Sequence, residues 1–367
     1  MHRNHVALVT ASAVALAATL SGCTGSPPSS TSSGAAPPPS SSSSSGPRVY
    51  VSDETGGAIV AIDPATRQVV QKINVGKRPR GIRISHDGAR LFVALSGSPI
   101  GGPGVDESKL PPADRAADGI GVVDLATGAV VRKYQSGPDP ESFAISADGR
   151  MLFVSNEDSG EMTALDLESG TIKARVKVGD EPEGVTTSPD GTLVFVSCEG
   201  ANEVVAVDTS NFTIAGRIPT GPRPRSIAFS RDGKTGFVAS ENSGTLTVFD
   251  VTTRKVTKTI TFARPTAAGA IPPRPMGQQL SPDGLQLFVT LGRARSIAVV
   301  DVDGETVSRT IDAVGDRPWG IGISADGRTL YTANGPSGDV SIVDVGKGTT
   351  EARVRVGGSP WGIAVRQ

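Results

Sequence analysis

The sequence is poor in the residues from which most catalytic and metal sites are built. Of 367 residues only three are histidine and two are cysteine. His2 and His5 precede the expected mature protein, which leaves His86, in a turn of sequence "SHDG" that we expect to face solvent. A single exposed histidine cannot build a histidine metal cluster or an acid–base pair, and we expect no serine triad on it. The lack of a CxxCH motif excludes covalent haem, so no metal and no cofactor are predicted.

Excess charge and long apolar runs are also missing. The formal net charge is -1, with 36 basic and 37 acidic residues, so nothing attracts the chain as a whole to nucleic acid. No motif for sequence-specific nucleic-acid binding is present, and aromatic residues make up only 4%. Instead the chain holds 45 glycines and 27 prolines, which is typical of many short strands joined by tight turns.

The first 46 residues differ in composition from the rest. The apolar run from Val6 to Leu20 is too short to span a membrane and follows a short basic head, so residues 1–22 are predicted to be an export signal. Leu20-Ser21-Gly22-Cys23 resembles the bacterial lipoprotein box, which implies acylation of Cys23. The alternative is ordinary signal cleavage with Cys23 incidental.

Residues 23–46 are predicted to be the acylated cysteine and a tether, and residues 47–367 the folded domain. The tether is rich in Ser and Pro and cannot bury a core. We therefore expect an exported, lipid-anchored monomer that faces the periplasm or the cell exterior. Cys198, in "LVFVSCEG", is then the only free thiol and is expected to be a small buried residue.

Three sequence markers recur along the folded domain. Asp-Gly pairs are separated by 61, 42, 42, 51 and 43 residues. A hydrophobic stretch ends in aspartate seven times, and a proline precedes an apolar strand seven times. The prolines are Pro79, Pro140, Pro182, Pro224, Pro275, Pro318 and Pro360.

Each repeat holds four short strands. In residues 181–221 they are "GVTTS", a "PDG" turn and "LVFVS", then "EVVAVD" and "FTIAGRIP". Four strands in about 42 residues is the period of a propeller blade. The sequence therefore predicts an all-β, seven-bladed β-propeller with four antiparallel strands per blade.

The two chain ends carry complementary halves of one repeat. Arg48 begins "RVYVS", a second strand with no first strand before it, and Trp361 begins "WGIAV", a first strand with nothing after it. We expect the C-terminal strand to close blade 1, so that the ring has no open edge.

The second strands carry a recurrent aromatic motif, as in "YVSD", "FVSN" and "YTAN". This motif resembles that of the YVTN-repeat family of seven-bladed propellers over residues 48–367. Stretches such as "RPWGIGISADGRTLYTANGPSGDVSIVD" are similar to the subgroup called PQQ-dependent catabolism-associated propellers. That resemblance implies an exported accessory protein of quinoprotein-linked oxidation without established catalysis of its own.

Two insertions mark one face of the expected ring. One, within residues 97–118, lies between the second and third strands of blade 2, and the other, "FARPTAAGAIPPR", joins blades 5 and 6. In an up-and-down blade both connections open on the same side, which we call the insertion face. Variable loops on a rigid scaffold commonly carry binding sites; the alternative is neutral drift of a tolerant face.

Charged and aromatic residues flank the repeat prolines and should ring the channel mouth on the insertion face. They are Arg78, Arg80, Asp139, Glu141, Glu181, Glu183, Arg223, Arg225, Arg274, Arg317, Trp319 and Trp361. One interpretation is an ion-pair ring that locks blades together. The other is a polarised mouth that binds a partner protein or a small anionic or aromatic ligand.

Two functions fit these features. The main hypothesis is a non-enzymatic binding or scaffold propeller that acts through the insertion face. The alternative is a lactonase-type hydrolase, because some propellers of similar repeat act on sugar lactones. Its water-activating base would have to be a carboxylate in the channel, and the candidates are Glu141, Glu183 and Glu199.

Overall fold

The computed structural model describes residues 46–367, except 102–105, 264–270 and 313. The predicted export signal, the predicted lipidation site Cys23 and the predicted tether up to residue 45 lie outside the described residues. Within the described part of the chain, no helix is long and apolar enough to cross a membrane.

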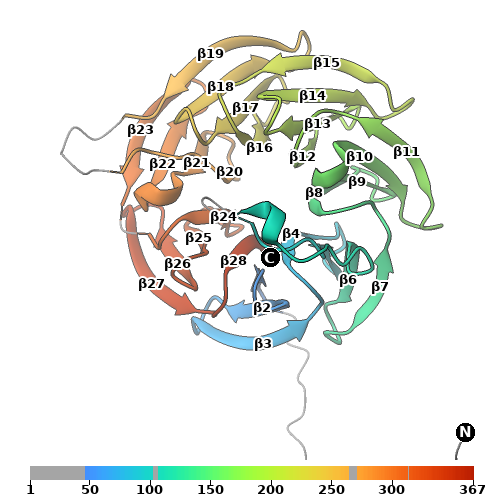
Figure 1. Ribbon diagram of the computed structural model, residues 1–367. Coiled ribbons are helices and arrows are strands. Elements are labelled where there is room, and N and C mark those ends of the chain that lie inside the picture. The colour runs from blue at the N-terminus through green and yellow to red at the C-terminus, as the bar shows by residue number, and fades with distance from the viewer. Residues whose placement is uncertain (1–45, 102–105, 264–270, 313) are drawn as a thin grey trace, which may run out of the picture. The chain divides into compact units, whose positions relative to one another are not determined.

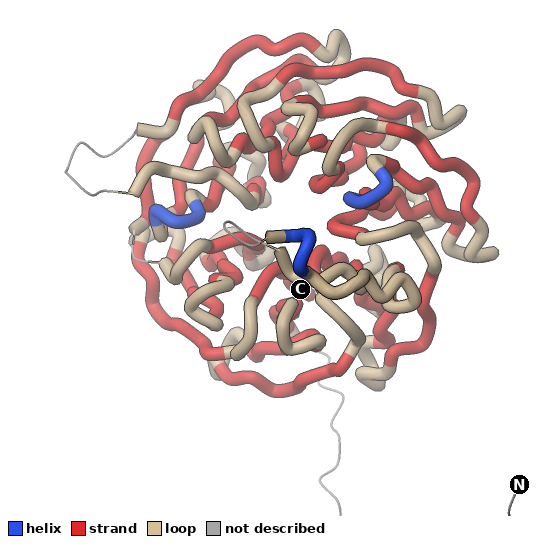
Figure 2. The backbone as a smooth tube through the Cα atoms, viewed as in Figure 1, coloured by secondary structure: helices blue, strands red, loops and turns tan. Residues whose placement is uncertain are grey.

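Seven four-stranded antiparallel sheets are arranged around a central channel (Figure 1). The predicted seven-bladed propeller is thereby confirmed, and strands account for most of its regular structure (Figure 2). The described helices are three short 3₁₀ turns, and all of them lie in loops between second and third strands. They are η1 (Glu107–Lys109), η2 (Glu157–Ser159) and η3 (Gly292–Ala294).

Each blade contributes one strand to each of four concentric layers. The strands of a layer are named in order from blade 1 to blade 7. The innermost strands are β28 (Pro360–Arg366), β4 (Pro79–Ile84), β8 (Pro140–Ile145), β12 (Pro182–Thr187), β16 (Pro224–Phe229), β20 (Gln278–Leu280) and β24 (Pro318–Ile323). The second strands are β1 (Arg48–Asp53), β5 (Arg90–Leu95), β9 (Met151–Asn156), β13 (Leu193–Cys198), β17 (Thr235–Ser240), β21 (Gln286–Thr290) and β25 (Thr329–Asn334). The third strands are β2 (Ala58–Asp63), β6 (Gly119–Asp124), β10 (Glu161–Asp166), β14 (Glu203–Asp208), β18 (Thr245–Asp250), β22 (Ile297–Asp301) and β26 (Asp339–Asp344). The outermost strands are β3 (Gln68–Asn74), β7 (Val130–Tyr134), β11 (Ile172–Lys177), β15 (Ile214–Pro219), β19 (Lys255–Thr261), β23 (Thr306–Ile311) and β27 (Thr349–Arg355).

The hydrophobic core lies between adjacent blades rather than within one. Second and third strands are apolar on both faces, because each face packs against a neighbouring sheet. One cluster joins Phe237 and Leu246 of blade 5 to Leu287 and Val300 of blade 6. Burial of each such side chain contributes roughly 1.5–3 kcal/mol, so every blade is stabilised by both of its neighbours.

The innermost strands approach one another so closely that most carry glycine two residues after the proline. A Cβ atom on Gly184 would lie 2.2 Å from the carbonyl oxygen of Arg225, and one on Gly320 would lie 2.5 Å from that of Trp361. Real Cβ contacts do not become that short. These glycines therefore allow the narrow ring that surrounds the channel.

The predicted closure of blade 1 is confirmed. Strand β1 pairs with β2 on one side and with β28 on the other, with Tyr50 opposite Ala364. The buried Asp53 carboxylate accepts hydrogen bonds from the backbone N–H groups of Gly56, at 2.9 Å, and Ser359, at 3.0 Å. The two ends of the domain are thus joined by a strand ladder and by a buried side chain.

Blade 6 departs from the expected pattern. Its innermost strand begins at Gln278, whereas the other six begin at the repeat proline. Thr290 accepts a hydrogen bond from Met276 N–H and donates one to the Gly277 carbonyl, which lies outside the regular ladder. Met276 and Gly277, which precede β20, thus bond to the second strand without being part of the regular ladder.

Candidate functional site

A large cavity opens on the insertion face, and all seven blades contribute to its wall. Its volume is about 1330 Å³, and we call it the mouth cavity. It is lined by every residue that the sequence analysis placed at the channel mouth, and also by Glu199. These are Arg78, Arg80, Asp139, Glu141, Glu181, Glu183, Glu199, Arg223, Arg225, Arg274, Arg317, Trp319 and Trp361.

Five of the seven residues that precede the repeat prolines have a left-handed backbone. These five residues are Arg78, Asp139, Glu181, Arg223 and Arg317, and their φ angles range from 40° for Arg78 to 62° for Arg223. This region is unfavourable for residues other than glycine and costs on the order of 1–2 kcal/mol each. The fold therefore holds charged side chains at the mouth in strained conformations.

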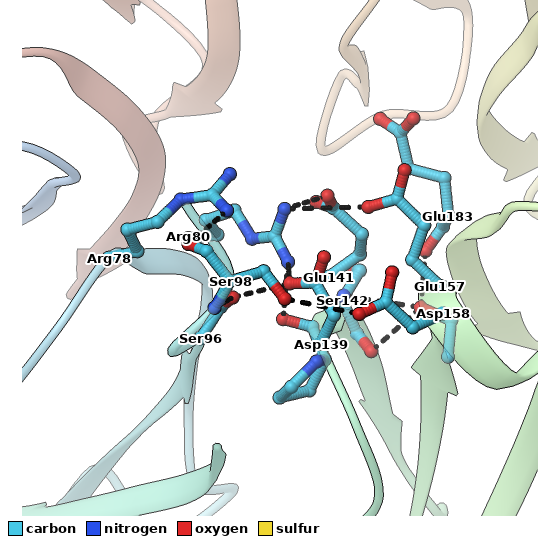
Figure 3. A network of polar contacts seen from close by, with 12 residues as sticks. Arg78, Arg80, Ser96, Ser98, Asp139, Glu141, Ser142, Glu157, Asp158 and Glu183 are labelled. Atoms are coloured by element: carbon cyan, nitrogen blue, oxygen red, sulfur yellow. Dashed lines mark hydrogen bonds and ion pairs between the residues drawn. The ribbon is translucent and has the colours of Figure 1, made fainter. Parts of the chain in front are cut away.

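Arg80 lies at the centre of an acidic cluster on blade 3. Its guanidinium group forms ion pairs with Asp139 and Glu141 and lies 3.6 Å from Glu157 (Figure 3). Asp139 also accepts a hydrogen bond from the Ser96 hydroxyl. Three carboxyl groups share one buried cation, so one arginine cannot neutralise all of them.

Arg225 is the centre of a second cluster, between blades 4 and 5. It pairs with Glu183 and Glu199, and it donates two hydrogen bonds to Glu241 at 2.6 and 2.8 Å. Three further arginines lie within 4.0 Å of Glu241, namely Arg223, Arg274 and Arg317. The ion-pair interpretation of the ring thus describes Arg80 and Arg225 well, while a wide cavity remains above them.

A second ring of carboxylates was missed by the sequence analysis apart from Glu199. Its members lie four positions after the aromatic residue of a second strand. They are Glu54 in blade 1, Glu157 in blade 3, Glu199 in blade 4 and Glu241 in blade 5. The Glu54 carboxylate forms an ion pair with Arg78, with 3.0 Å between Oε1 and Nη2. The signal was present in the repeat, because this position follows the second strand on the insertion face in every blade.

Two buried glutamates have raised pKa values. Burial raises the pKa of Glu141 well above its ordinary value; Arg80 opposes this effect, and the nearby carboxyl groups of Glu157 and Glu183 reinforce it. Burial also raises the pKa of Glu183, against the influence of Arg225 and with a further contribution from Glu157. Glu141 and Glu183 therefore hold a proton to higher pH than exposed glutamates do.

Two other carboxyl groups of the same clusters stay ionised. Burial disfavours the charged form of Asp139, but Arg80 and the Ser96 hydroxyl outweigh it and lower the pKa. Burial likewise opposes ionisation of Glu241, and Arg225 with its neighbouring arginines lowers the pKa nonetheless. The mouth thus combines permanent charges with two carboxyl groups that can change protonation state.

An aromatic and basic side faces this acidic side. The rings of Trp319 and Trp361 are tilted by 36° with centroids 5.3 Å apart. The guanidinium groups of Arg225 and Arg317 lie 4.8 and 4.7 Å from the centre of the Trp319 ring. Most acidic groups of the cavity wall come from blades 3 and 4, the arginines come from blades 2, 5, 6 and 7, and the two tryptophans come from blades 7 and 1.

Described parts of the blade 2 insertion form one wall of the mouth cavity. Ser98, Pro99, Ile100 and Gly101 line it on one side of the segment, and Leu110, Pro111, Ala113 and Arg115 line it on the other. Arg78 donates hydrogen bonds to the carbonyl oxygens of Ser98 and Pro99, at 2.8 and 3.2 Å. The described parts of the insertion are thus held against the mouth cavity by Arg78.

Two sequence expectations outside the mouth can also be placed. Cys198 is fully buried, and burial raises the pKa of its thiol to about 12, so it is a core residue and not a reactive thiolate. His86 is exposed in the turn after β4, on the face opposite the insertions. In the described part of the chain, no group of three or more His, Cys, Asp or Glu residues is arranged to hold a metal ion.

The chain is similar to known propellers in sequence and fold. The profile of the family described as "Lactonase, 7-bladed beta-propeller" matches residues 181–356, which is slightly less than half of the chain. No curated protein matches the chain.

Several solved structures have a similar fold. The periplasmic gluconolactonase PpgL of Pseudomonas aeruginosa is 22% identical with a TM-score of 0.69, over 88% of this chain and 99% of that one. A Bacteroides uniformis protein described as a candidate 6-phosphogluconolactonase is 18% identical with a TM-score of 0.67, over 87% and 99%. The hydrazine synthase of Kuenenia stuttgartiensis is 21% identical with a TM-score of 0.63, over 77% and 88%. At this level of identity the likeness shows a common fold.

Proposed function

We propose that this protein is a lactonase-type hydrolase whose site is the mouth cavity. The observation that carries the proposal is the pair of buried carboxyl groups with raised pKa values, Glu141 and Glu183, which line one cavity together with arginines. The family profile match over residues 181–356 and the gluconolactonase of similar fold support hydrolysis over the scaffold role that the sequence alone favoured.

Glu183 is our candidate general base. In its ionised form it takes a proton from a water molecule while the water oxygen attacks the lactone carbonyl carbon. The carbonyl oxygen gains negative charge in this step. Arg225 contacts Glu183 directly, and Arg317 has a buried Nε without a hydrogen-bond partner among the described residues. Positive groups of this kind stabilise a developing oxyanion.

Glu141 is our candidate general acid. When the ring C–O bond of the tetrahedral intermediate breaks, protonated Glu141 donates its proton to the leaving alkoxide, and the product is a hydroxy acid. Glu183 is then protonated and Glu141 ionised. Both carboxyl groups line the open mouth cavity, so exchange of protons with solvent restores their starting states. Glu199 is held by Arg225 and Arg223 and has a positioning role in this scheme.

Lactone hydrolysis can be measured directly as acid release from glucono-δ-lactone in a pH-stat, above the spontaneous rate. We expect the purified protein to accelerate the reaction and Glu183→Gln to lower kcat by about 10²–10⁴-fold. The matched control is Glu168→Gln, because Glu168 is an exposed carboxylate on the opposite face of blade 3. Equal rates for Glu183→Gln and the unchanged protein would contradict the assignment of the base.

If no lactone is hydrolysed, the result favours the hypothesis of a non-enzymatic binding protein. A pull-down with Trp319→Ala/Trp361→Ala tests it, since both tryptophans line the mouth cavity. Loss of a partner in this variant would support a docking role, and a role beside quinoprotein-linked oxidation would predict a partner from that class.

We also propose that the protein is exported and anchored by a lipid on Cys23. The lipoprotein-like box and the Ser/Pro-rich segment after it support this localisation. Membrane fractionation of the full chain and of Cys23→Ala tests the anchor. The unchanged chain should sediment with membranes, and the variant should be released into the soluble exported fraction.

A further inference from the structure

A second, smaller cavity of about 130 Å³ occupies the central channel. Its wall contains the residue two positions after each repeat proline, and this residue is always glycine or serine. The seven are Gly81, Ser142, Gly184, Ser226, Gly277, Gly320 and Gly362. Because these side chains are small, the backbone of the innermost strands forms much of the wall. The N–H groups of Ser142, Gly184, Gly277 and Gly362 donate to hydroxyl groups of the second strands.

Three charged residues line this small cavity, namely Glu183 and Arg225 at its mouth side and Arg83 deeper in the channel. Arg83 is four positions after Pro79 in β4, and it lines the cavity. The same position in the other innermost strands holds short or uncharged residues, namely Ala144, Thr186, Ala228, Gln279, Gly322 and Ala364. Arg83 is also reached by solvent, although it lies on the innermost strand of the ring.

Arg83 has no acidic partner among the described residues. Its Nη1 donates to the carbonyl oxygen of the adjacent Ile82 at 3.0 Å, and no described carboxylate lies within 4.0 Å of its guanidinium nitrogens. Eight arginines line the mouth cavity, and seven of them lie within 4.0 Å of at least one carboxylate. Arg293 is the exception, and no described carboxylate lies within that distance of it. The crowding of protein atoms around the channel disfavours the charged form and lowers the pKa of Arg83, although solvent reaches the side chain, and no acidic neighbour offsets that effect.

We propose that the central channel binds a small oxyanion, a carboxylate or inorganic phosphate, on Arg83. A guanidinium group presents paired N–H donors that match the oxygens of such an anion. Arg83 lines only the small cavity, whereas Glu183 and Arg225 line both cavities, so the channel site adjoins the mouth. The bound anion stabilises the ring of blades and takes no part in catalysis.

The proposal is tested by thermal unfolding of the full chain in sodium acetate, sodium phosphate and sodium chloride. We expect a saturable rise in Tm with acetate or phosphate, because a ligand at ten times its Kd raises the folding equilibrium constant about 11-fold. Arg83→Gln should lose this response, while Arg150→Gln, which removes an exposed arginine of blade 3, should keep it.

Other outcomes separate the alternatives. The same response in Arg83→Gln as in the unchanged chain, or no response to any of the three salts, would overturn the site. A rise with chloride alone would overturn the oxyanion assignment. If Arg83→Gln does not fold, Arg83→Lys replaces it, and a weakened response is then expected. Lactone hydrolysis should be unaffected in these variants, so failure of the anion site and failure of the proposed hydrolase are distinguishable.

Discussion

The ring of Trp361, in the last strand of the chain, lies 5.3 Å from that of Trp319 in blade 7. Trp319 belongs to β24, and Trp361 belongs to β28, which completes blade 1 with β1 from the other end of the domain. Closure of the ring and the aromatic side of the mouth therefore depend on the same strand. Loss of this strand should damage the fold and the site together.

Removal of residues 359–367 is predicted to abolish cooperative unfolding of the whole domain. The deletion removes β28, one of the two strands that pair with β1, exposes the edge of blade 1 and removes one of the two backbone donors to Asp53. Circular dichroism during heating measures this. Deletion of Gln367 alone is the control, since β28 ends at Arg366. An unchanged melt for the longer deletion would refute the closure.

Asp139→Asn and Glu141→Gln are predicted to have different effects, although both remove a partner of Arg80. At pH 7 Asp139 is ionised, and loss of its charge should destabilise the fold by about 3 kcal/mol. Its pKa is lowered in the folded state, so this stabilisation is present above an unfolded pKa of about 3.9 and is lost as the pH falls through the folded pKa.

The sign is opposite for Glu141. Its pKa is raised on folding, so its favourable contribution is complete below an unfolded pKa of about 4.3 and is lost as the pH rises through the folded value. Glu141→Gln should therefore gain stability relative to the unchanged protein as the pH is increased. Urea unfolding at several pH values tests both variants, and parallel pH curves for the two would contradict the assignment.

Glu181→Gly is predicted to be more stable than Glu181→Val by about 1 kcal/mol or more. Glu181 is exposed, has a φ of 50°, and makes no ion pair within 4.0 Å among the described residues. Glycine adopts this conformation without strain, whereas a β-branched residue does not. Chemical denaturation measures the difference. Equal stability of the two variants would show that the backbone at this position relaxes.

Lactone hydrolysis is predicted to show a bell-shaped pH dependence. The acidic limb reflects ionisation of Glu183, whose pKa is raised by burial, so it should lie at higher pH than for an exposed glutamate. The basic limb reflects loss of the proton from Glu141, whose pKa is raised well above its ordinary value. Rates measured in a pH-stat check both limbs. A profile that is unchanged in Glu141→Gln would exclude Glu141 as the acid.

Much of the site could be predicted from the repeat alone. The period assigns each residue an angular position and a height in the ring, so residues beside the prolines had to converge at the mouth. The same reasoning applied to the position of Glu54, Glu157 and Glu241 would have found the second carboxylate ring.

The choice of partners could not be predicted. Arg80 and Arg225 occupy equivalent positions in blades 2 and 5, yet Arg80 faces carboxylates of blade 3, whereas Arg225 faces those of blades 4 and 5. A repeat pattern does not specify which neighbour a long flexible side chain reaches. The protonation of Glu141 and Glu183 depends in turn on that choice and on burial.

The sequence by itself determined the seven blades, the closure by β28 and the charged ring at the mouth, because these follow from the order of strands and turns. The tertiary structure alone decided that Asp139 and Glu241 stay ionised, that Glu141 and Glu183 have raised pKa values, and that Arg83 lacks an acidic partner among the described residues. Electrostatic interactions depend on distance and burial in three dimensions, and residues far apart in the chain set both.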